Sequence, residues 1–224
     1  MALSTRRLDL VDRIEELRER LSQIESEQEE LKRQLESAFS NSDSKDIEDL
    51  DRWEEFESRW ENLEAEKTEL SGEKNKFKET VVLWNNELDP NELRRETDDY
   101  QAEIDERYAD EDSCVITVRE LTFGQLQRVS DDMMEESFNV DIENEDIDGT
   151  PRQGFYQTEL LNEAIEDWPP GAPSREEYGR ESPVAGDYPI PVGEWLFERV
   201  DAINTTGDTE MGNSSLKEEM NFKY

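Results

Sequence analysis

The chain has 224 residues, of which 61 are acidic and 25 basic, so its formal net charge at pH 7 is −36. Apolar residues make up only 33% of the chain and charged residues 38%, against about 25% charged in an average soluble domain. This composition excludes one large globular core. No segment approaches the roughly 18 consecutive apolar residues of a membrane-spanning helix, and the first residues lack the apolar segment of a secretory signal.

The residue types also exclude several kinds of functional site. Histidine is absent and Cys114 is the only cysteine, so an internal disulfide, a histidine-based catalytic triad and the usual zinc, haem and iron–sulfur ligand sets are excluded. No glycine spacing matches a phosphate-binding loop. Phosphate contacts need clustered Lys and Arg, which disfavours nucleic-acid partners. We therefore expect a non-enzymatic protein without metal or cofactor and with neither nucleic-acid nor membrane partners.

The acidity itself has two main interpretations. Low hydrophobicity with high net charge is typical of disorder. It is also typical of a folded protein in concentrated salt, where the Debye length falls to about 3 Å at 1 M and repulsion between carboxylates is screened. The even spread of acids, 17 Arg against 8 Lys, and five Trp, eight Phe and six Tyr favour the second interpretation. The sequence thus predicts a halophilic protein; an acidic mimic of DNA is a further alternative.

Apolar residues in the N-terminal region recur at alternating steps of three and four. This spacing keeps one seam on a helix and defines heptad a and d positions. Gln28 is the polar residue in the series, Leu3 and Leu10 extend it backwards, and the turn-forming segment Ser40 to Lys45 interrupts it. The series is Ile14, Leu17, Leu21, Ile24, Gln28, Leu31, Leu35 and Ala38.

The heptad pattern resumes after the turn at 40–45 and is richer in aromatic residues. Its d positions are Phe56, Leu63, Leu70, Phe77 and Trp84, and its a positions are Trp53, Trp60, Lys67, Lys74, Val81 and Leu88. In this register Leu63 and Leu70 are buried and Glu64 faces solvent. The two seams predict an antiparallel coiled-coil helical hairpin over residues 1–88, which ends before Pro90 because proline disfavours helix in the preceding residue. The alternative is that each run pairs with another copy of the chain, as a homo-oligomer.

Trp53, Phe56 and Trp60 are too wide for a tight two-stranded seam. They predict either a third, covering helix or an interaction surface near the hairpin tip, and with Trp84 they are the candidate partner-binding residues. The covering helix is predicted from Asn91 to about Ala109, and residues 89–112 are assigned as a connecting helix and acidic linker. Its apolar face carries Leu93, Tyr100, Ile104 and Tyr108.

The composition changes at Cys114, where the β-branched segment CVITVREL predicts a strand. Thr122 and Gln125 form a capping box for a helix over residues 123–138. Two more helices are predicted over residues 155–168 and 193–204, separated by a loop rich in Pro and Gly. The predicted buried residues of the first helix are Phe123, Leu126, Val129, Met133 and Met134; those of the last are Trp195, Leu196, Val200 and Ile203.

The sequence therefore predicts a mainly α protein in which a small helix-rich α+β domain, residues 113–204, follows the hairpin and precedes a flexible polar tail, residues 205–224. Cys114 and Trp168 are expected to be buried. An acidic loop precedes the second helix of this domain, and Asn144, Asp146, Asp148 and Gly149 match the first half of an EF-hand loop. Phe155 stands where the bidentate Glu is required, so a solvated loop is expected and not a calcium site.

The region from Val115 to about Asn204 resembles the tail assembly chaperones of tailed viruses. The similar segments are VITVRELTFGQLQRV, FYQTELLNEAIEDWPPG and PIPVGEWLFERVDAIN. The resemblance implies binding of tape-measure and tail-tube proteins during tail assembly, without catalysis. With the halophilic composition it points to a haloarchaeal tailed virus or provirus, and to the host cytoplasm or the virion. The alternatives are a cellular coiled-coil adaptor or scaffold of a halophile and an acidic DNA mimic.

Overall fold

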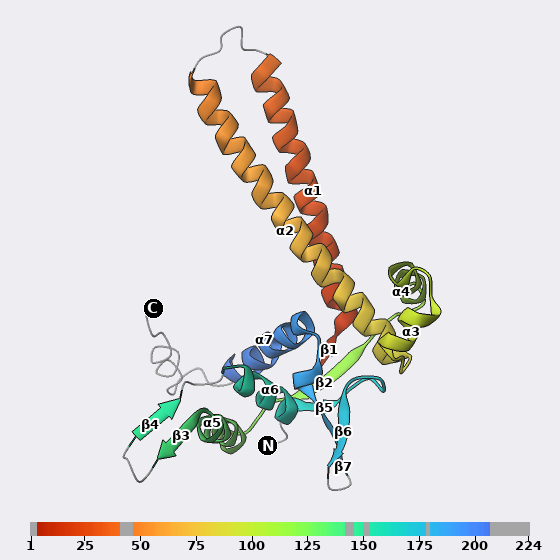
Figure 1. Cartoon of the computed structure of the whole chain (residues 1–224), viewed down its shortest axis with the longest axis vertical. Helices are drawn as coiled ribbons and strands as arrows, with labels where there is room; N and C mark the ends of the chain where they lie inside the picture. Colours follow the sequence, from red (N-terminus) through yellow and green to blue (C-terminus); the bar gives the residue numbers. More distant parts are fainter. Residues whose placement is uncertain (1–3, 41–46, 142–145, 150–152, 178–179, 207–224) are drawn as a thin grey trace. The chain divides into compact units, whose positions relative to one another are not determined.

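The computed structural model describes residues 4–40, 47–141, 146–149, 153–177 and 180–206. Over these residues the protein is mainly helical with a small three-stranded sheet, as the sequence predicts at this coarse level (Figure 1). The chain divides into two compact units. We name them the helical unit, Leu10–Val82 with Leu93–Ser113, and the mixed unit, Met1–Asp9 with Leu83–Glu92 and Cys114–Tyr224.

The N-terminal residues form a strand of the mixed unit and not the start of a helix. Strand β1 (Thr5–Asp9) pairs antiparallel with β2 (Val115–Arg119), and the Asp9 carboxylate accepts a hydrogen bond from the Cys114 amide at 2.8 Å. The extension of the heptad helix back to residue 1 is therefore wrong; Leu3 lies outside the described residues. Pairing with a strand more than a hundred residues away decides this segment, and local periodicity carries no signal of it.

Helix α1 (Leu10–Ser40) buries the predicted seam. The polar Gln28 is 6% exposed and donates a hydrogen bond to the Glu64 carboxylate at 2.8 Å, which satisfies a buried amide. Leu35 is half-buried, and the side chain of Ala38 lies outside the described residues. The buried residues at seam positions are Leu10, Ile14, Leu17, Leu21, Ile24, Gln28 and Leu31.

Helix α2 (Ile47–Asn85) buries its seam mainly in its last third, where Phe77, Val81 and Trp84 are at most 5% exposed. It ends at Asn85, earlier than Pro90, through Glu87, whose φ of 50° lies in the left-handed region. Leu88 N then donates to Leu83 O, one of the last helical carbonyls. Pro90 does not end α2 but opens the next helix, a position that proline favours.

The single helix predicted over 91–109 is wrong, because the structure has two helices there. Helix α3 (Pro90–Glu96) is followed by α4 (Tyr100–Tyr108), and the Asp99 side chain accepts a hydrogen bond from Ala102 N as the N-cap of α4. A capping aspartate competes with helix continuation, which explains the break. Lys78 lies 2.6 Å from Asp105, so α4 packs beside the end of α2 that is far from Trp53 and Trp60. It does not cover those aromatic residues.

The mixed unit is built on a sheet with strand order β1-β2-β5, in which β5 is Ile165–Asp167. Helix α6 (Gln153–Ala164) packs against α5 (Phe123–Ser137) and α7 (Ile190–Thr206). The Asn204 side chain accepts a hydrogen bond from Leu121 N at 2.8 Å and joins the end of α7 to the chain before α5. The core includes Ile116, Val118, Leu160, Leu161, Leu196, Val200 and Ile203.

The capping box is confirmed, but part of the predicted stripe of α5 is wrong. Gln125 Oε1 accepts hydrogen bonds from the Thr122 amide and hydroxyl, and Thr122 Oγ1 accepts from Gln125 N. Val129 is buried, whereas Phe123 is 81% exposed and Met134 47% exposed. Phe123 opens the helix, and a helical side chain leans toward the preceding turn, which a first residue lacks.

Several predicted loops contain strands. The acidic loop includes a hairpin of β3 (Phe138–Asp141) and β4 (Asp146–Gly149), and the Pro- and Gly-rich loop includes β6 (Ser174–Glu177), β7 (Arg180–Pro183) and a 3-10 turn at Ala185–Asp187. The helix predicted to reach Trp168 ends at Ala164, because Ile165 pairs with Val118 in the sheet. Helix α7 is longer than predicted at both ends, and the remaining tail, 207–224, lies outside the described residues.

The charge balance leads to a prediction about salt. The chain has 61 acidic residues but only 25 basic ones, so ion pairs such as Arg13–Glu73 at 2.9 Å can neutralise only a minority of the carboxylates. Net repulsion between carboxylates therefore dominates the surface. We expect cooperative thermal unfolding at about 3 M KCl and loss of tertiary structure below a few tenths molar, because screening removes the repulsion. Circular dichroism melting curves at the two salt concentrations measure this, and an unchanged Tm contradicts it.

Candidate protein-binding surface

Three aromatic side chains form a continuous row on α2. Trp53, Phe56 and Trp60 are spaced by three and four residues, which places them on one helix face. The ring centroids of Trp53 and Phe56 are 5.8 Å apart, and those of Phe56 and Trp60 are 5.9 Å apart with an interplanar angle of 26°. Trp53 is 42% exposed and the other two are half-buried. We name these three residues the aromatic ladder.

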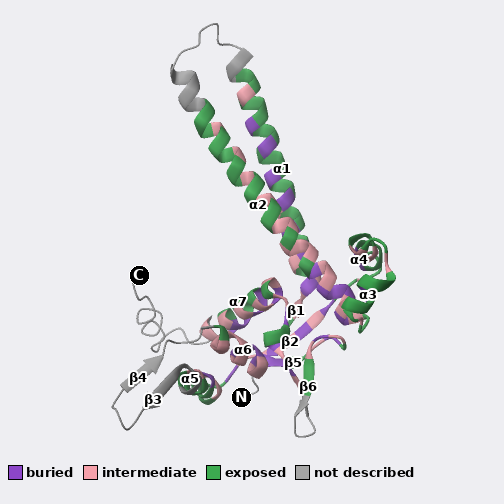
Figure 2. Cartoon of the chain, in the orientation of Figure 1, coloured by how far each residue is buried: buried purple, intermediate pink, exposed green. Residues whose placement is uncertain are grey.

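The two helices contribute unequally to their shared seam. On α1 the seam positions are buried up to Leu31, whereas on α2 Leu63 and Leu70 are only half-buried, against the prediction (Figure 2). Side-chain contacts show that the helices run antiparallel: Arg13–Glu73 at 2.9 Å, Arg20–Glu66 at 2.7 Å, Lys67–Glu25 at 3.2 Å and Gln28–Glu64 at 2.8 Å. The a and d positions of α2 from Trp53 to Leu70, apolar except for Lys67, are thus at most half-buried.

Carboxylates line one side of the ladder, where Glu57 takes a heptad e position and Glu54 and Glu61 take b positions, whereas Arg59 takes a g position on the other side. Glu54, Glu55, Glu57 and Glu61 are exposed, and none of them pairs with a basic side chain of the described residues. By contrast, Glu66 and Glu73, which follow the ladder in the sequence of α2, pair with arginines of α1. The ladder is therefore an apolar strip with unneutralised carboxylates along one side.

The fourth candidate, Trp84, does not belong to this surface. It is 5% exposed, its ring lies 4.8 Å from the Tyr188 ring, and its carbonyl accepts a hydrogen bond from Gly171 N at 2.8 Å. Its heptad position is on the same helix, but the end of α2 belongs to the mixed unit and is enclosed there. Trp84 therefore stabilises the fold of this unit and offers no exposed ring to a partner.

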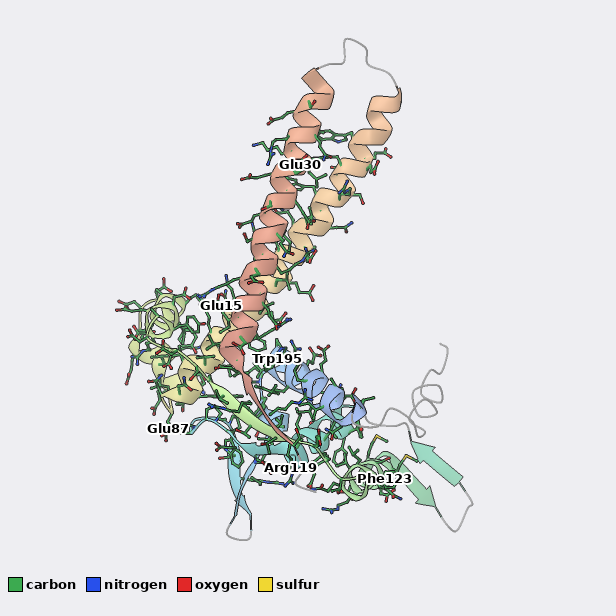
Figure 3. The ribbon with its side chains drawn as sticks, turned by 180° about the vertical axis from the view of Figure 1, so that it is seen from behind. Glu15, Glu30, Glu87, Arg119, Phe123 and Trp195 are labelled. Carbon is green, nitrogen blue, oxygen red and sulfur yellow. The ribbon has the colours of Figure 1, made fainter. Side chains whose placement is uncertain are left out.

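Three residues that the sequence predicts to be buried lie in the mixed unit. Trp195 and Cys114 are buried as predicted, with the Arg199 guanidinium 5.7 Å above the Trp195 ring, whereas Trp168 is only half-buried, against the prediction. Phe123 and Ile190, neither of which the sequence predicts to be exposed, are 81% and 74% exposed (Figure 3 labels Phe123). Each opens a helix, and this position was the available signal for their exposure.

Metal ligation and membrane insertion receive no support in the part of the chain that is described. Among those residues no group of three or more Asp, Glu, Cys or His side chains is arranged to hold a metal ion. Of the four residues resembling an EF-hand loop, Asn144 lies outside the described residues, and Asp146, Asp148 and Gly149 form β4. No described helix is long and apolar enough to cross a membrane.

A polar network that the heptad pattern did not predict joins α2, α3 and α4. One Glu79 oxygen accepts hydrogen bonds from Tyr100 Oη at 2.7 Å and Arg94 Nη2 at 2.9 Å, and the other pairs with Lys76 Nζ at 2.9 Å. Burial acts to raise the pKa of Glu79, but these donors and the charges of Lys76 and Arg94 outweigh it and lower the pKa. Burial and the Glu79 carboxylate raise the pKa of Tyr100 to about 12.

The Glu79 network predicts a pH-dependent effect of Glu79→Gln. The folded-state pKa of Glu79 is depressed, so the stability it contributes is present above its unfolded pKa and is lost as the pH falls through the folded value. The substitution should lower the free energy of unfolding by about 1–2 kcal/mol at neutral pH and by much less in acid. Urea unfolding at both pH values measures the difference; an equal effect at both contradicts it. Glu69→Gln, on the exposed side of α2, is the control.

A second network holds the mixed unit together around Arg119 of β2 (Figure 3). Its Nη2 donates to the Glu163 carbonyl at 3.0 Å, and its Nη1 lies 3.6 Å from Glu166. Gln125 Nε2 donates to the Glu163 carboxylate at 2.7 Å, which links the capping box of α5 to α6. Arg119 Nε is buried without a hydrogen-bond partner among the described residues, but the other contacts join β2, α5, α6 and β5 within the unit, so we interpret the network as structural.

Comparison with known proteins finds no matching family model, no matching curated protein and no matching solved structure.

Proposed function

We propose that the protein is a non-enzymatic assembly or structural protein of a haloarchaeal tailed virus, which binds tail components through the aromatic ladder. The observation that carries this proposal is the row of Trp53, Phe56 and Trp60, partly exposed in a chain of net charge −36. Trp and Tyr dominate the energetics of protein interfaces, and a row of rings on a charged surface is costly in solvent unless a partner covers it.

The rest of the helical unit supports this proposal as a scaffold for the ladder. We interpret α1 and α2 as an antiparallel coiled-coil hairpin, an interpretation supported by the seven-residue spacing of the seam and by the ion pairs between the two helices. The helix pair carries the ladder on the part of α2 that is far from α4. The partner class, tape-measure or tail-tube proteins, comes from the resemblance of residues 115–204 to tail assembly chaperones. The location proposed is the cytoplasm of a halophilic host, or the virion.

A cellular coiled-coil adaptor or scaffold of a halophile is the second candidate. It uses the same ladder and helix pair, so it is favoured by the same geometry and differs in the partner. Genes for tail-tube and tape-measure proteins beside the gene of this protein support the viral role. Their absence, together with capture of a host protein through the ladder, supports the adaptor.

The proposal is tested by affinity capture at about 3 M KCl from virus-producing cells, with purified tail-tube and tape-measure proteins as identified baits. Wild-type protein should retain at least one of them, and a Trp53→Ala/Trp60→Ala double variant should lose it while its circular dichroism spectrum is unchanged. Phe123→Ala/Ile190→Ala removes similarly exposed apolar side chains outside the ladder and should leave capture intact. Retention by the folded ladder variant, or capture of neither tail protein by the wild type, overturns the proposal.

A further inference from the structure

The proposed function leaves open what kind of surface the ladder recognises. The half-open strip extends from Trp53 through Phe56, Trp60 and Leu63 to Leu70 at heptad a and d positions, and it is apolar except at Lys67, which pairs with Glu25. At 1.5 Å per residue this strip is about 26 Å long. Another helix presents side chains at the same axial spacing, so it can insert apolar residues between these along the whole strip. A β-strand rises about 3.3 Å per residue and alternates its faces, and it does not match this spacing.

The charges around the strip select the partner further. Glu54, Glu57 and Glu61 line one side of the ladder without a basic partner among the described side chains, and Arg59 lies on its other side. Among the described side chains of α1, Arg33 pairs with Glu30 at 3.2 Å and Glu29 at 3.9 Å on its own helix and not with these carboxylates. A complementary helix therefore carries Lys or Arg beside its apolar stripe.

The chain itself shows both contacts that such a partner would make. Further along α2, after the ladder, its carboxylates pair with arginines of α1, as in Arg20–Glu66 at 2.7 Å. Guanidinium groups also lie over aromatic rings at several places: 4.6 Å for Arg94 over Tyr100, 5.5 Å for Arg18 over Tyr108 and 5.7 Å for Arg199 over Trp195. Cation–π contacts of this kind contribute about 0.5–2 kcal/mol each, and Trp is the best acceptor.

A second copy of this chain is a poor occupant of the strip. In an interface between two ladders the flanking carboxylates of one copy would meet those of the other, and each copy has a net charge of −36. Like charges placed across an interface are strongly unfavourable, and their desolvation adds to the penalty.

We propose that the aromatic ladder binds a cationic amphipathic α-helix of a partner protein, with apolar side chains against Trp53, Phe56 and Trp60 and Lys or Arg against the flanking glutamates. This inference rests on the proposed function for the site, and it specifies the chemistry of the partner. It applies equally to a viral and to a cellular partner.

The test uses the full-length protein and three designed helical peptides with identical apolar heptads. One carries Lys and Arg at the flanking positions, one carries Glu there, and one is the cationic peptide interrupted by proline. Isothermal titration calorimetry at about 1 M KCl should give binding of the cationic helix at least about tenfold tighter than of the other two. Equal affinities for the cationic and anionic helices, or for the interrupted peptide, overturn the inference.

Two sets of variants locate the site. Trp53→Ala/Trp60→Ala should weaken the cationic peptide by about tenfold or more, and Glu54→Gln/Glu57→Gln/Glu61→Gln should weaken it and flatten its salt dependence. Asp131→Asn/Asp132→Asn/Glu194→Gln removes the same number of exposed charges outside the ladder and should change little. If the outside triple variant weakens binding as much as the ladder variants, attraction to the whole acidic surface explains the binding and the inference is wrong.

Sedimentation equilibrium of the protein alone tests whether a second copy of the chain binds the aromatic ladder. A dimer that disappears with Trp53→Ala/Trp60→Ala assigns the ladder to a second copy and overturns the inference. Failure of this inference and failure of the proposed function give different results. Loss of tail-protein capture on ladder substitution without any preference for cationic peptides leaves the proposed function intact, and selective cationic binding without tail-protein capture leaves only the inference.

Discussion

Replacing Gly171 with alanine is expected to lower the free energy of unfolding of the mixed unit by about 2–4 kcal/mol, because the new methyl group has no space. A Cβ at this position would lie 2.7 Å from Trp84 O, 2.8 Å from Leu83 O and 2.9 Å from Glu87 Cα. All three are backbone atoms, two in the last turn of α2 and one just after it, so no flexible side chain can move aside. The strain would also stretch the 2.8 Å hydrogen bond from Gly171 N to Trp84 O.

The control for Gly171→Ala is Gly193→Ala in the same unit. Gly193 lies in α7, and a Cβ added there meets no atom within 4 Å. Alanine has a higher helix propensity than glycine, so this substitution should stabilise the protein by about 0.5–1 kcal/mol. Urea denaturation at high salt compares the two variants. Similar effects in both would show that the loop of Gly171 does not pack against the end of α2.

The approach of Gly171 to Trp84 illustrates what the sequence could not predict. The Pro- and Gly-rich composition predicts that Pro169, Pro170 and Gly171 end a helix. Nothing in the local sequence predicts that Gly171 contacts Trp84, which lies 87 residues earlier in the chain. The same limit explains β1, β5 and the enclosed Trp84, since each is decided by long-range strand pairing or packing. Elements with local chemistry, such as the seam of α1 and the capping box at Thr122 and Gln125, were predictable.

The candidate site was partly predictable for a related reason. Helical spacing alone places Trp53, Phe56 and Trp60 on one face, and ring size alone argues against a tight seam. Heptad position does not say how well each side of a seam is covered, so the half-buried state of Leu63 and Leu70 could not be predicted. Glu64, predicted to face solvent, also accepts the hydrogen bond of the buried Gln28, and the polar residue in the seam of α1 gave a hint of such a partner.

The burial of Phe77 leads to the second large effect. Phe77→Ala is expected to lower the free energy of unfolding of the helical unit by about 3–5 kcal/mol, because it removes a large side chain that is 0% exposed. Its neighbours on α2, Val81 and Val82, are also fully buried. Here α1 and α4 both contact α2, through Arg13–Glu73 at 2.9 Å and Lys78–Asp105 at 2.6 Å, so the site has little freedom to collapse around the cavity.

Comparison of substitutions along α2 tests whether the helical unit is anchored at this end. Leu63→Ala and Leu70→Ala remove half-buried side chains and should cost clearly less than Phe77→Ala, about 1–2 kcal/mol each, since part of each side chain is already in solvent. Glu69→Ala, on the exposed face, should change the stability by less than about 0.5 kcal/mol. Urea unfolding at about 3 M KCl gives the four values. If Leu63→Ala destabilises the protein as much as Phe77→Ala, α2 is packed as tightly near Leu63 as near Phe77. The aromatic ladder then lacks the exposed face on which partner binding depends.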